Sequence, residues 1–354
     1  MFLIPFCCHA GGTDSMEQIC KSLTLNQWAF LAHFYSTVCT TTWLWDNRAP
    51  FHLTKDVNGF EQVVLWNPRG ASARVNLHGG QVISWRNHRG EEFLFNSSKA
   101  NFKVPKTVRG GISACFPQFG NCDALDQHGF ARKRMWKIDE NPPPMRLNDS
   151  RGKSYVDLML KPAEEDLKYW PHSFEFRLQV SLALDGNLTL VSRIRNINGK
   201  PFNFSFAYHT YLSVSDISEV RIEGLETLDY LDNLCKRERF TEQGDAITFE
   251  SEVDRVYLSS APCVAVLDHE KKRTYVVRKE GLPDVVLWNP WDKKSKAMAD
   301  FGDSDYKQML CIDGAAIETG VTLKPGEEWT GQVELAAIPS SFCTDNIHPR
   351  LKVF

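Results

Sequence analysis

The chain has 354 residues, of which 42% are hydrophobic and 24% charged, and its formal net charge is −3. This composition is typical of a soluble globular protein. The slightly acidic balance excludes a general nucleic-acid binder, whose surface would be strongly basic. The ten cysteines are irregularly spaced, without CxxC or Cys/His metal patterns, so we expect reduced thiols, no bound metal and a cytoplasmic location.

The first 45 residues differ from the rest of the chain. Met1 to Ala10 is apolar but lacks the basic residues that open a secretory signal. Residues 22–45 contain no charged side chain, yet they are too rich in Thr, Ser, Asn and Gln for a membrane span. We therefore expect an extension without function in residues 1–45, a folded domain in residues 46–343, a tail in residues 344–354, and no membrane partner.

The segment from Val108 to Trp136 contains two glycine-flanked basic motifs. Arg109 precedes two glycines, and Arg132 ends the sequence QHGFAR. Glycine lets the backbone approach a ligand closely, and a guanidinium group matches the oxygens of phosphate or carboxylate. For an isolated motif, surface charges beside turn-forming glycines are the more frequent explanation. A solvated face is the ordinary explanation for a basic cluster such as Arg132, Lys133, Arg134 and Lys137, but its position beside Gly129 favours a local anion site.

The body of the chain has the pattern of β-strands. Apolar and polar residues alternate from Phe174 to Leu184, and an Asp-Gly-Asn turn leads into Leu188 to Ile194, as in a hairpin. Residues 321–335 repeat the arrangement around a Lys-Pro-Gly-Glu turn. Glu164 to Tyr169 is either a short helix or a charged loop. Many short strands and few helices predict an all-β fold, a large antiparallel β-sandwich.

Two other local features bear on domain organisation. The sequence VVLWNP occurs at residues 63–68 and again at 285–290, but the flanking residues differ. We interpret the two copies as strand ends closed by similar Asn-Pro turns. The stretch from Pro142 to Gly152 is expected to be a surface loop, because strand pattern resumes on both sides of it.

Five further motifs lie between Trp45 and Cys343. They are LHGGQVISW from Leu77, FAYHTYL from Phe206, DRVY from Asp254, VVLWNPW from Val285 and MLCIDGAAIE from Met309. With the segment 108–136, they resemble the glucose-6-phosphate 1-epimerases of the aldose 1-epimerase-like superfamily, most closely the plant members. The resemblance implies a galactose-mutarotase-like β-supersandwich that interconverts the α and β anomers of glucose 6-phosphate, or related hexose 6-phosphates, without a cofactor.

Anomer interconversion needs few chemical groups. A base removes the proton from the C1 hydroxyl, an acid protonates the ring oxygen, and the opened sugar recloses as the other anomer. Each positioned group contributes roughly 10²–10⁴-fold. The resemblance makes His209 the acid, although a histidine on an aromatic strand is, by itself, more often a core residue. It makes Asp313 the base, on the opposite side of the sugar.

The resemblance also assigns ligand contacts. Arg109 and Arg132 would hold the phosphate, Gln127 would contact the sugar, and His128 would support the pocket. We interpret His78, in a His-Gly-Gly sequence, as a structural residue of a tight turn.

Two more positions lie in motifs that the resemblance covers. Asp254 would accept a hydrogen bond from a sugar hydroxyl or orient His209; outside the motif, an ion pair with Arg255 or a turn is equally expected. Trp288 and Trp291 could form an aromatic wall for the sugar, but core packing is the more frequent fate of tryptophan.

The chain departs from the family pattern at two positions. Asp313 stands where the family has glutamate, and a displacement of about 1 Å can cost on the order of 10²-fold in rate. Glu318 is five residues further along and faces the other side of a strand. Weakened activity is the first explanation, ahead of a compensating backbone shift or binding without turnover. Ser113 replaces a usual proline, which loosens the loop that holds Arg109.

These departures keep more than one function open. The first is an isomerase acting on C1 of glucose 6-phosphate, as a monomer. The second is a catalytically weak or silent sugar-phosphate-binding protein. The third, a mutarotase of unphosphorylated hexoses, is disfavoured by the paired arginines.

Overall fold

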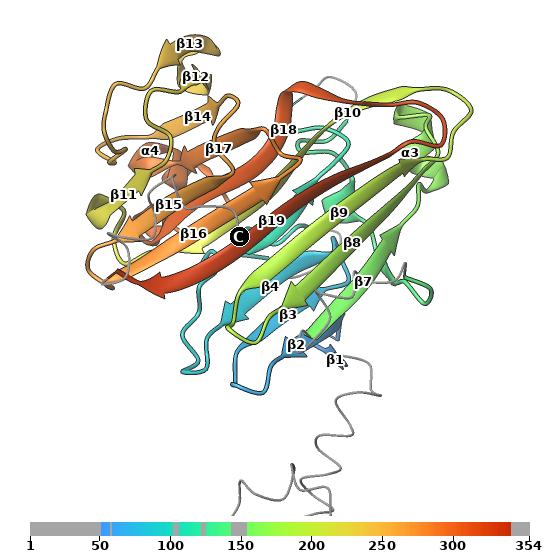
Figure 1. Ribbon diagram of the computed structural model, residues 1–354, viewed down its shortest axis with the longest axis horizontal. Coiled ribbons are helices and arrows are strands. Elements are labelled where there is room, and N and C mark those ends of the chain that lie inside the picture. The colour runs from blue at the N-terminus through green and yellow to red at the C-terminus, as the bar shows by residue number, and fades with distance from the viewer. Residues whose placement is uncertain (1–50, 57–58, 102–105, 122–124, 143–153, 341–354) are drawn as a thin grey trace, which may run out of the picture. The chain divides into compact units, whose positions relative to one another are not determined.

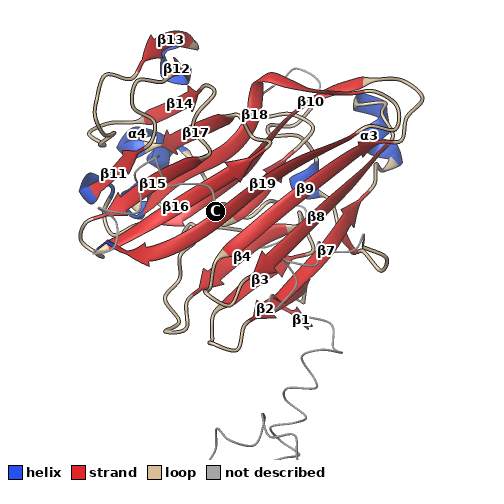
Figure 2. Cartoon of the chain, viewed as in Figure 1, coloured by secondary structure: helices blue, strands red, loops and turns tan. Residues whose placement is uncertain are grey.

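The computed structural model describes residues 51–56, 59–101, 106–121, 125–142 and 154–340. They belong to one compact unit that begins at Phe51. The expected extension, the C-terminal tail and all of the proline-rich loop except Pro142 lie outside these residues. Strands dominate the described part (Figure 2), which confirms the all-β prediction. No helix in it is long and apolar enough to cross a membrane.

Two antiparallel sheets face each other (Figure 1). The larger has eleven strands, in the spatial order β1 (His52–Lys55), β2 (Glu61–Trp66), β3 (Ser72–Asn76), β4 (Gln81–Arg86), β5 (Ile112–Cys115), β10 (Phe202–Ser213), β18 (Met309–Leu323), β17 (Asp284–Asn289), β14 (Val253–Tyr257), β12 (Asp229–Asp232) and β13 (Glu238–Thr241). The smaller has eight, in the order β11 (Val220–Glu223), β15 (Cys263–Asp268), β16 (Arg273–Glu280), β19 (Glu328–Pro339), β9 (Leu188–Asn196), β8 (Phe174–Leu182), β7 (Ser154–Leu160) and β6 (Lys137–Ile138). Strands β10 and β18 occupy the centre of the larger sheet.

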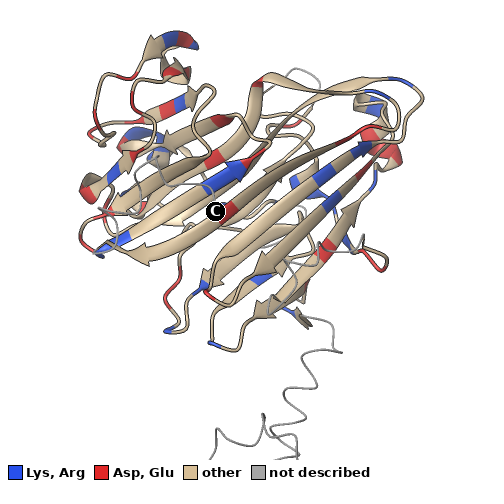
Figure 3. Cartoon of the chain, viewed as in Figure 1, with Lys and Arg blue, Asp and Glu red and all other residues tan. Residues whose placement is uncertain are grey.

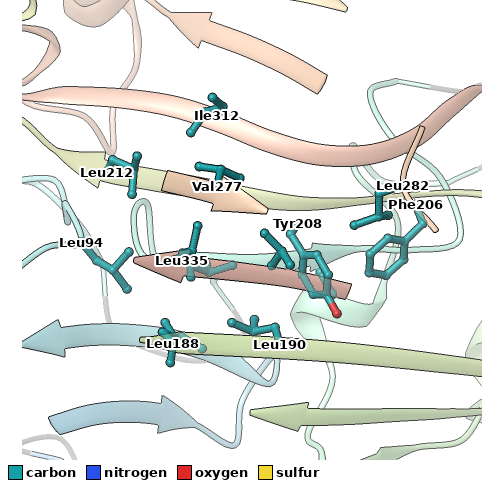
Figure 4. Packing of buried hydrophobic residues seen from close by; sticks show 14 of the residues in the cluster. Leu94, Leu188, Leu190, Phe206, Tyr208, Leu212, Val277, Leu282, Ile312 and Leu335 are labelled. Carbon is teal, nitrogen blue, oxygen red and sulfur yellow. The ribbon is translucent and has the colours of Figure 1, made fainter. Parts of the chain in front are cut away.

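The hydrophobic core lies between the two sheets. Leu188, Leu190 and Leu335 of the smaller sheet are buried in the same cluster as Leu212 and Ile312 of the larger one (Figure 4). Burying each such side chain contributes about 1.5–3 kcal/mol. Because successive strand residues point to opposite faces, only every second residue of a strand enters this core. The other face of each sheet is free for different residues.

One of the two predicted hairpins is confirmed. Strands β8 and β9 pair from Phe174 with Asn196 to Leu182 with Leu188. The other is wrong, because the strands on either side of its Lys-Pro-Gly-Glu turn, β18 and β19, lie in different sheets and do not pair, so this turn carries the chain from one sheet to the other. Both Asn-Pro sequences close strand ends. The Asn67 side-chain amide donates to Ala183 O over 2.7 Å, and that of Asn289 donates to Met309 O over 2.9 Å.

Helices are few and short in the part of the chain that the structure describes. Glu164–Tyr169 forms helix α3, so the helical alternative is correct for this segment. A second helix, α4 (Trp291–Ala297), follows β17 and was not predicted. Within the described residues, four 3₁₀ turns cover Ala131–Lys133, Ile217–Glu219, Asn233–Cys235 and Asp305–Gln308.

Candidate active site

The candidate site occupies the face of the larger sheet that points away from the smaller one. On β10, Tyr208 points toward the smaller sheet, where its hydroxyl donates to Ser192 Oγ over 2.6 Å. By the two-residue period of a strand, His209 and Tyr211 point to the other face. The residues that pair across strands with His209 and Tyr211 point to this face as well, as do those two positions away from such a partner and those that continue the same row of pairs into β17 and β14. They are Ser113 and Cys115 of β5, Cys311 and Asp313 of β18, Trp288 of β17 and Asp254 of β14.

His209 and Asp313 are joined directly. Nδ1 of His209 lies 2.7 Å from Oδ2 of Asp313, and Oδ1 accepts a hydrogen bond from the Thr210 amide at 2.8 Å. A carboxylate only accepts, so Nδ1 carries the proton. Asp313 is 0% exposed and His209 6% exposed. The two predicted catalytic groups are therefore brought together, but in contact with each other rather than on opposite sides of a cleft.

Tyr211 connects this pair to an arginine. Its hydroxyl lies 2.9 Å from Nε2 of His209 and accepts a hydrogen bond from Arg109 Nη1 at 3.3 Å. The guanidinium of Arg109 also donates to both carboxylate oxygens of Asp300, at 3.1 and 3.2 Å. Burial, as the largest effect, raises the pKa of Tyr211, so the phenol stays protonated and donates to His209. A continuous chain of hydrogen bonds thus runs from Asp300 to Asp313.

His128 lies over the imidazole of His209. The two ring centroids are 5.4 Å apart with planes inclined by 24°, and the Gly120 amide donates to His128 Nδ1 over 3.1 Å. His128 adopts a left-handed backbone with φ of 63°. Burial first, and then the neighbouring cations, lower its pKa to about 2. His128 is therefore neutral at physiological pH, with its proton on Nε2.

Arg132 has donors to spare. Its Nη2 donates to the Gln127 carbonyl over 2.8 Å, while its buried Nε has no acceptor among the described residues. The Gln127 side chain is exposed. Gly129 allows this loop to approach the strand closely, because a Cβ there would lie 2.2 Å from Phe116 O. An unsatisfied, half-buried guanidinium group suits an incoming anion.

Two of the neighbouring basic residues are already paired. Lys133 forms an ion pair with Asp126 at 2.7 Å, and Arg134 binds the buried Asp166 at the start of helix α3. Within the described residues, Arg132 takes part in no such pair. Among Arg132, Lys133 and Arg134, Arg132 is therefore the cation that stays available to a ligand, and the three do not form a diffuse positive patch.

Asp254 lies at the other side of the same face. Its Oδ1 accepts from Asn233 over 2.7 Å, and Lys294 of α4 lies 3.6 Å from Oδ2. Burial, as the largest effect, raises the Asp254 pKa. The ammonium group of Lys294 also lies 5.9 Å from the Trp288 ring centroid. No hydrogen bond joins Asp254 to His209 in the described structure, and Arg255 pairs with other carboxylates.

The two departures from the family pattern have clear positions. Ser113 is the direct cross-strand partner of His209 and is 5% exposed, so it borders the imidazole. Glu318 is exposed and pairs with Arg237 at 3.1 Å. Glu318 therefore lies outside the cluster around His209.

Sequence reasoning missed three residues of this site. Tyr211 could have been found, because it lies two residues from His209 on the same strand face. Asp300 and Lys294 had no signal, because the loop and helix after β17 reach the site only through tertiary folding. The described part contains no group of three or more His, Cys, Asp or Glu side chains arranged to hold a metal ion.

The side chains gathered on this face of the large β-sandwich are of the kinds that serve proton transfer and anion binding. Comparison with known proteins identifies the family. Residues 61–336 match the aldose 1-epimerase family model, and the chain belongs to this family. It is 62% identical over 308 residues to a protein of Cenchrus ciliaris named “Putative glucose-6-phosphate 1-epimerase”, covering 86% of this chain and 93% of that one.

More distant proteins share either this name or the fold. A protein of Escherichia coli with the same name is 29% identical over 269 residues, covering 75% of this chain and 87% of the relative. A structure described as a “putative mutarotase” from Salmonella typhimurium superposes with a TM-score of 0.71 at 24% identity, covering 82% and 97% of the two chains. The galactose 1-epimerase of Lactobacillus acidophilus gives 0.62 at 14%, covering 82% and 98%. The predicted mutarotase-like sandwich is confirmed.

Proposed function

We propose that this protein interconverts the α and β anomers of glucose 6-phosphate. The observation that carries the proposal is the hydrogen-bonded chain from Arg109 through Tyr211 to His209 and Asp313. It links a group suited to phosphate with a group suited to proton transfer. The name and 62% identity of the Cenchrus ciliaris relative support the same substrate.

His209 is the group that exchanges protons with the sugar. When the sugar binds, Nε2 exchanges the hydrogen bond from Tyr211 for one from the C1 hydroxyl and takes that proton. The C1=O bond forms as the C1–O5 bond breaks, and the same nitrogen returns the proton to O5. Both oxygens are bonded to C1, so one imidazole reaches both in turn. Rotation about C1–C2 and the reverse steps give the other anomer. Tyr211, protonated, donates a hydrogen bond to negative charge that develops on oxygen.

Asp313 acts through His209 in this proposal. Its full burial and its bonds to Nδ1 and the Thr210 amide support a positioning role, in which the carboxylate fixes the tautomer and stabilises the imidazolium. Direct proton acceptance by Asp313 would require the hydrogen bond to His209 to break when the sugar binds. Substitution of Asp313 separates these two roles.

Arg109 and Arg132 hold the phosphate, and Gln127 and Asp254 contact sugar hydroxyls. The free Nε of Arg132 supports this assignment. Arg109 must exchange the Asp300 carboxylate for phosphate. That exchange is favourable because a phosphate ester carries up to two charges and three acceptor oxygens, against one charge and two oxygens for Asp300.

Exchange NMR between α- and β-glucose 6-phosphate tests the proposal, with D-glucose as the unphosphorylated comparison. We expect the protein to accelerate exchange of glucose 6-phosphate well above the buffer rate and that of glucose far less. Binding without acceleration would favour the rival function, a silent sugar-phosphate-binding protein. The rival is motivated by the shorter carboxylate at position 313. Equal acceleration of both sugars would show that the protein does not recognise the phosphate group of its substrate.

A further inference from the structure

A cavity of about 640 Å³ lies beside the turns that join β2 to β3, β8 to β9 and β15 to β16. None of the candidate-site residues lines it. Its walls come from residues 67–71, 85–93, 184–187, 271–273 and 337–339, which belong to turns and strand ends of both sheets. The volume is within the range of about 300–1,000 Å³ that small-molecule sites occupy.

The floor of this cavity carries a buried guanidinium group. Arg273 is 5% exposed, donates to Glu91 over 2.6 Å and to the Ser213 carbonyl over 2.9 Å, and lies 4.5 Å from the Tyr275 ring centroid. Its Nε has no acceptor among the described residues. A buried donor without an acceptor is costly, and an added ligand oxygen or water would remove the cost.

The rim of the cavity is basic. Arg69, Arg89, Lys271 and Lys272 are exposed, and none of them forms an ion pair within the described part of the chain. The lining holds five lysine and arginine side chains against two carboxylates, an excess of three positive charges. Figure 3 shows basic residues at the tips of the loops on this edge of the sandwich.

Arg69 and Arg89, two of the four exposed cations at the rim, lie in turns that buried or half-buried asparagines stabilise. The Asn67 side-chain oxygen accepts from the Arg69 amide at 3.0 Å, and that of Asn87 accepts from the Arg89 amide at 2.9 Å. The Asn67 amide group also donates to Ala183 O, which ties the neighbouring turn to the same rim. These backbone positions are fixed before any ligand arrives, which lowers the entropy cost of binding.

The lysine turn is held in a similar way. The fully buried Asp268 accepts from the Lys271 amide at 3.2 Å, and the Ser340 amide donates to the Lys272 carbonyl over 2.9 Å. Lys272 has a φ of 48°, an uncommon backbone for a residue other than glycine.

We propose that this cavity binds a small phosphorylated metabolite with at least two negative charges. Three turns, each fixed by hydrogen bonds, present cations around a half-open cavity of about 640 Å³, which suits a compact anion rather than a long acidic peptide. The guanidinium forks of Arg69 and Arg89 match phosphate oxygens, and the two lysines supply point charges. The site is separate from the phosphate contacts proposed at Arg109 and Arg132.

Calorimetric titration of the full chain with inorganic pyrophosphate tests the proposal. We expect two binding events in the parent protein. Lys271→Gln/Lys272→Gln should weaken one of them by roughly 10-fold or more, because each lost charge-assisted contact has about that effect. Arg109→Ala/Arg132→Ala should remove the other event and leave this one intact.

Three controls keep the result interpretable. Lys168→Gln/Lys200→Gln neutralises two exposed lysines elsewhere and should leave both events unchanged. Lys271→Arg/Lys272→Arg keeps the charge and should retain binding. Thermal unfolding and the anomer-exchange rate should match the parent in all lysine variants. The proposal is overturned if pyrophosphate gives one event that Arg109→Ala/Arg132→Ala abolishes, or if Lys168→Gln/Lys200→Gln weakens binding as much as Lys271→Gln/Lys272→Gln.

Discussion

Tyr208 and Tyr211 lie on one strand, three residues apart, and their hydroxyls do different work. Tyr208 faces the smaller sheet, where its hydroxyl donates to the fully buried Ser192 and so joins the two sheets. Tyr211 faces outward and stands between Arg109 and His209. Burial raises the pKa of both phenols. The same side chain is structural on one face of β10 and part of a proton and anion site on the other.

The largest expected effect is on the outer face. His209→Asn should lower the exchange rate of glucose 6-phosphate by about 10²–10⁴-fold, because the group that exchanges protons with the sugar is lost. Exchange NMR measures the rate. Binding of glucose 6-phosphate by calorimetry should stay within a few-fold of the parent, roughly the effect of one lost neutral hydrogen bond. Loss of binding would mean that His209 holds the ligand instead.

Asp313 should have the second largest effect. Asp313→Asn is expected to slow exchange by on the order of 10²-fold, because the amide cannot stabilise the imidazolium and misplaces the ring. Asp313→Glu tests how the carboxylate acts. The Asp313 side chain is fully buried, so an extra methylene there should not raise the rate. A rate above that of the parent would instead identify Asp313 as a direct base that is too short.

The arginines should distinguish phosphorylated from free sugar. Arg109→Ala or Arg132→Ala is expected to lower kcat/KM for glucose 6-phosphate by roughly 10–100-fold, the size of a lost charge-assisted contact of about 1.5–3 kcal/mol. The rate with glucose should change little. Equal losses with both sugars would remove the arginine from the phosphate site.

The two tyrosines offer a matched pair of variants. Tyr208→Phe should lower the free energy of unfolding by about 1–3 kcal/mol, because Ser192 loses its buried partner, and leave the exchange rate unchanged. Tyr211→Phe should slow exchange by roughly 10-fold with a smaller loss of stability, since Arg109 and His209 keep their other partners. Denaturant unfolding and exchange NMR give the two readouts. Similar profiles for both variants would end the distinction between the faces.

Asp300 should have the smallest effect, in the opposite direction. Asp300→Asn removes the carboxylate that competes for Arg109, so glucose 6-phosphate should bind a few-fold more tightly, roughly the value of a half-exposed ion pair. Asp303→Asn neutralises a nearby exposed carboxylate and serves as the control. Weaker binding in Asp300→Asn would show that Asp300 orients Arg109 for the phosphate.

Much of the fold was predictable because strand periodicity is a local property. The alternation from Phe174 to Leu184 and the turns beside it were enough for the hairpin of β8 and β9. The order of strands was not predictable in this way. His209 and Asp313 are 104 residues apart and meet only because β10 and β18 are neighbours at the centre of the sheet.

The residues of the site also divide into those that a local motif predicts and those that only the tertiary fold brings to the site. His209, Asp313, Arg109 and Arg132 lie in motifs that could be read locally. Asp300 reaches the guanidinium group of Arg109 from a loop that lies 191 residues further along the chain. No local pattern in the sequence contains that information.

The central position of β10 has a consequence for how the protein responds to its ligand. Strands at the middle of a sheet open only when most of the molecule unfolds. A ligand bound there raises the free energy of unfolding of the whole sandwich by RT ln(1 + [L]/Kd) for a single site. The melting temperature of the intact protein should therefore rise with the concentration of a ligand that binds the outer face, and the rise reports the affinity of that face.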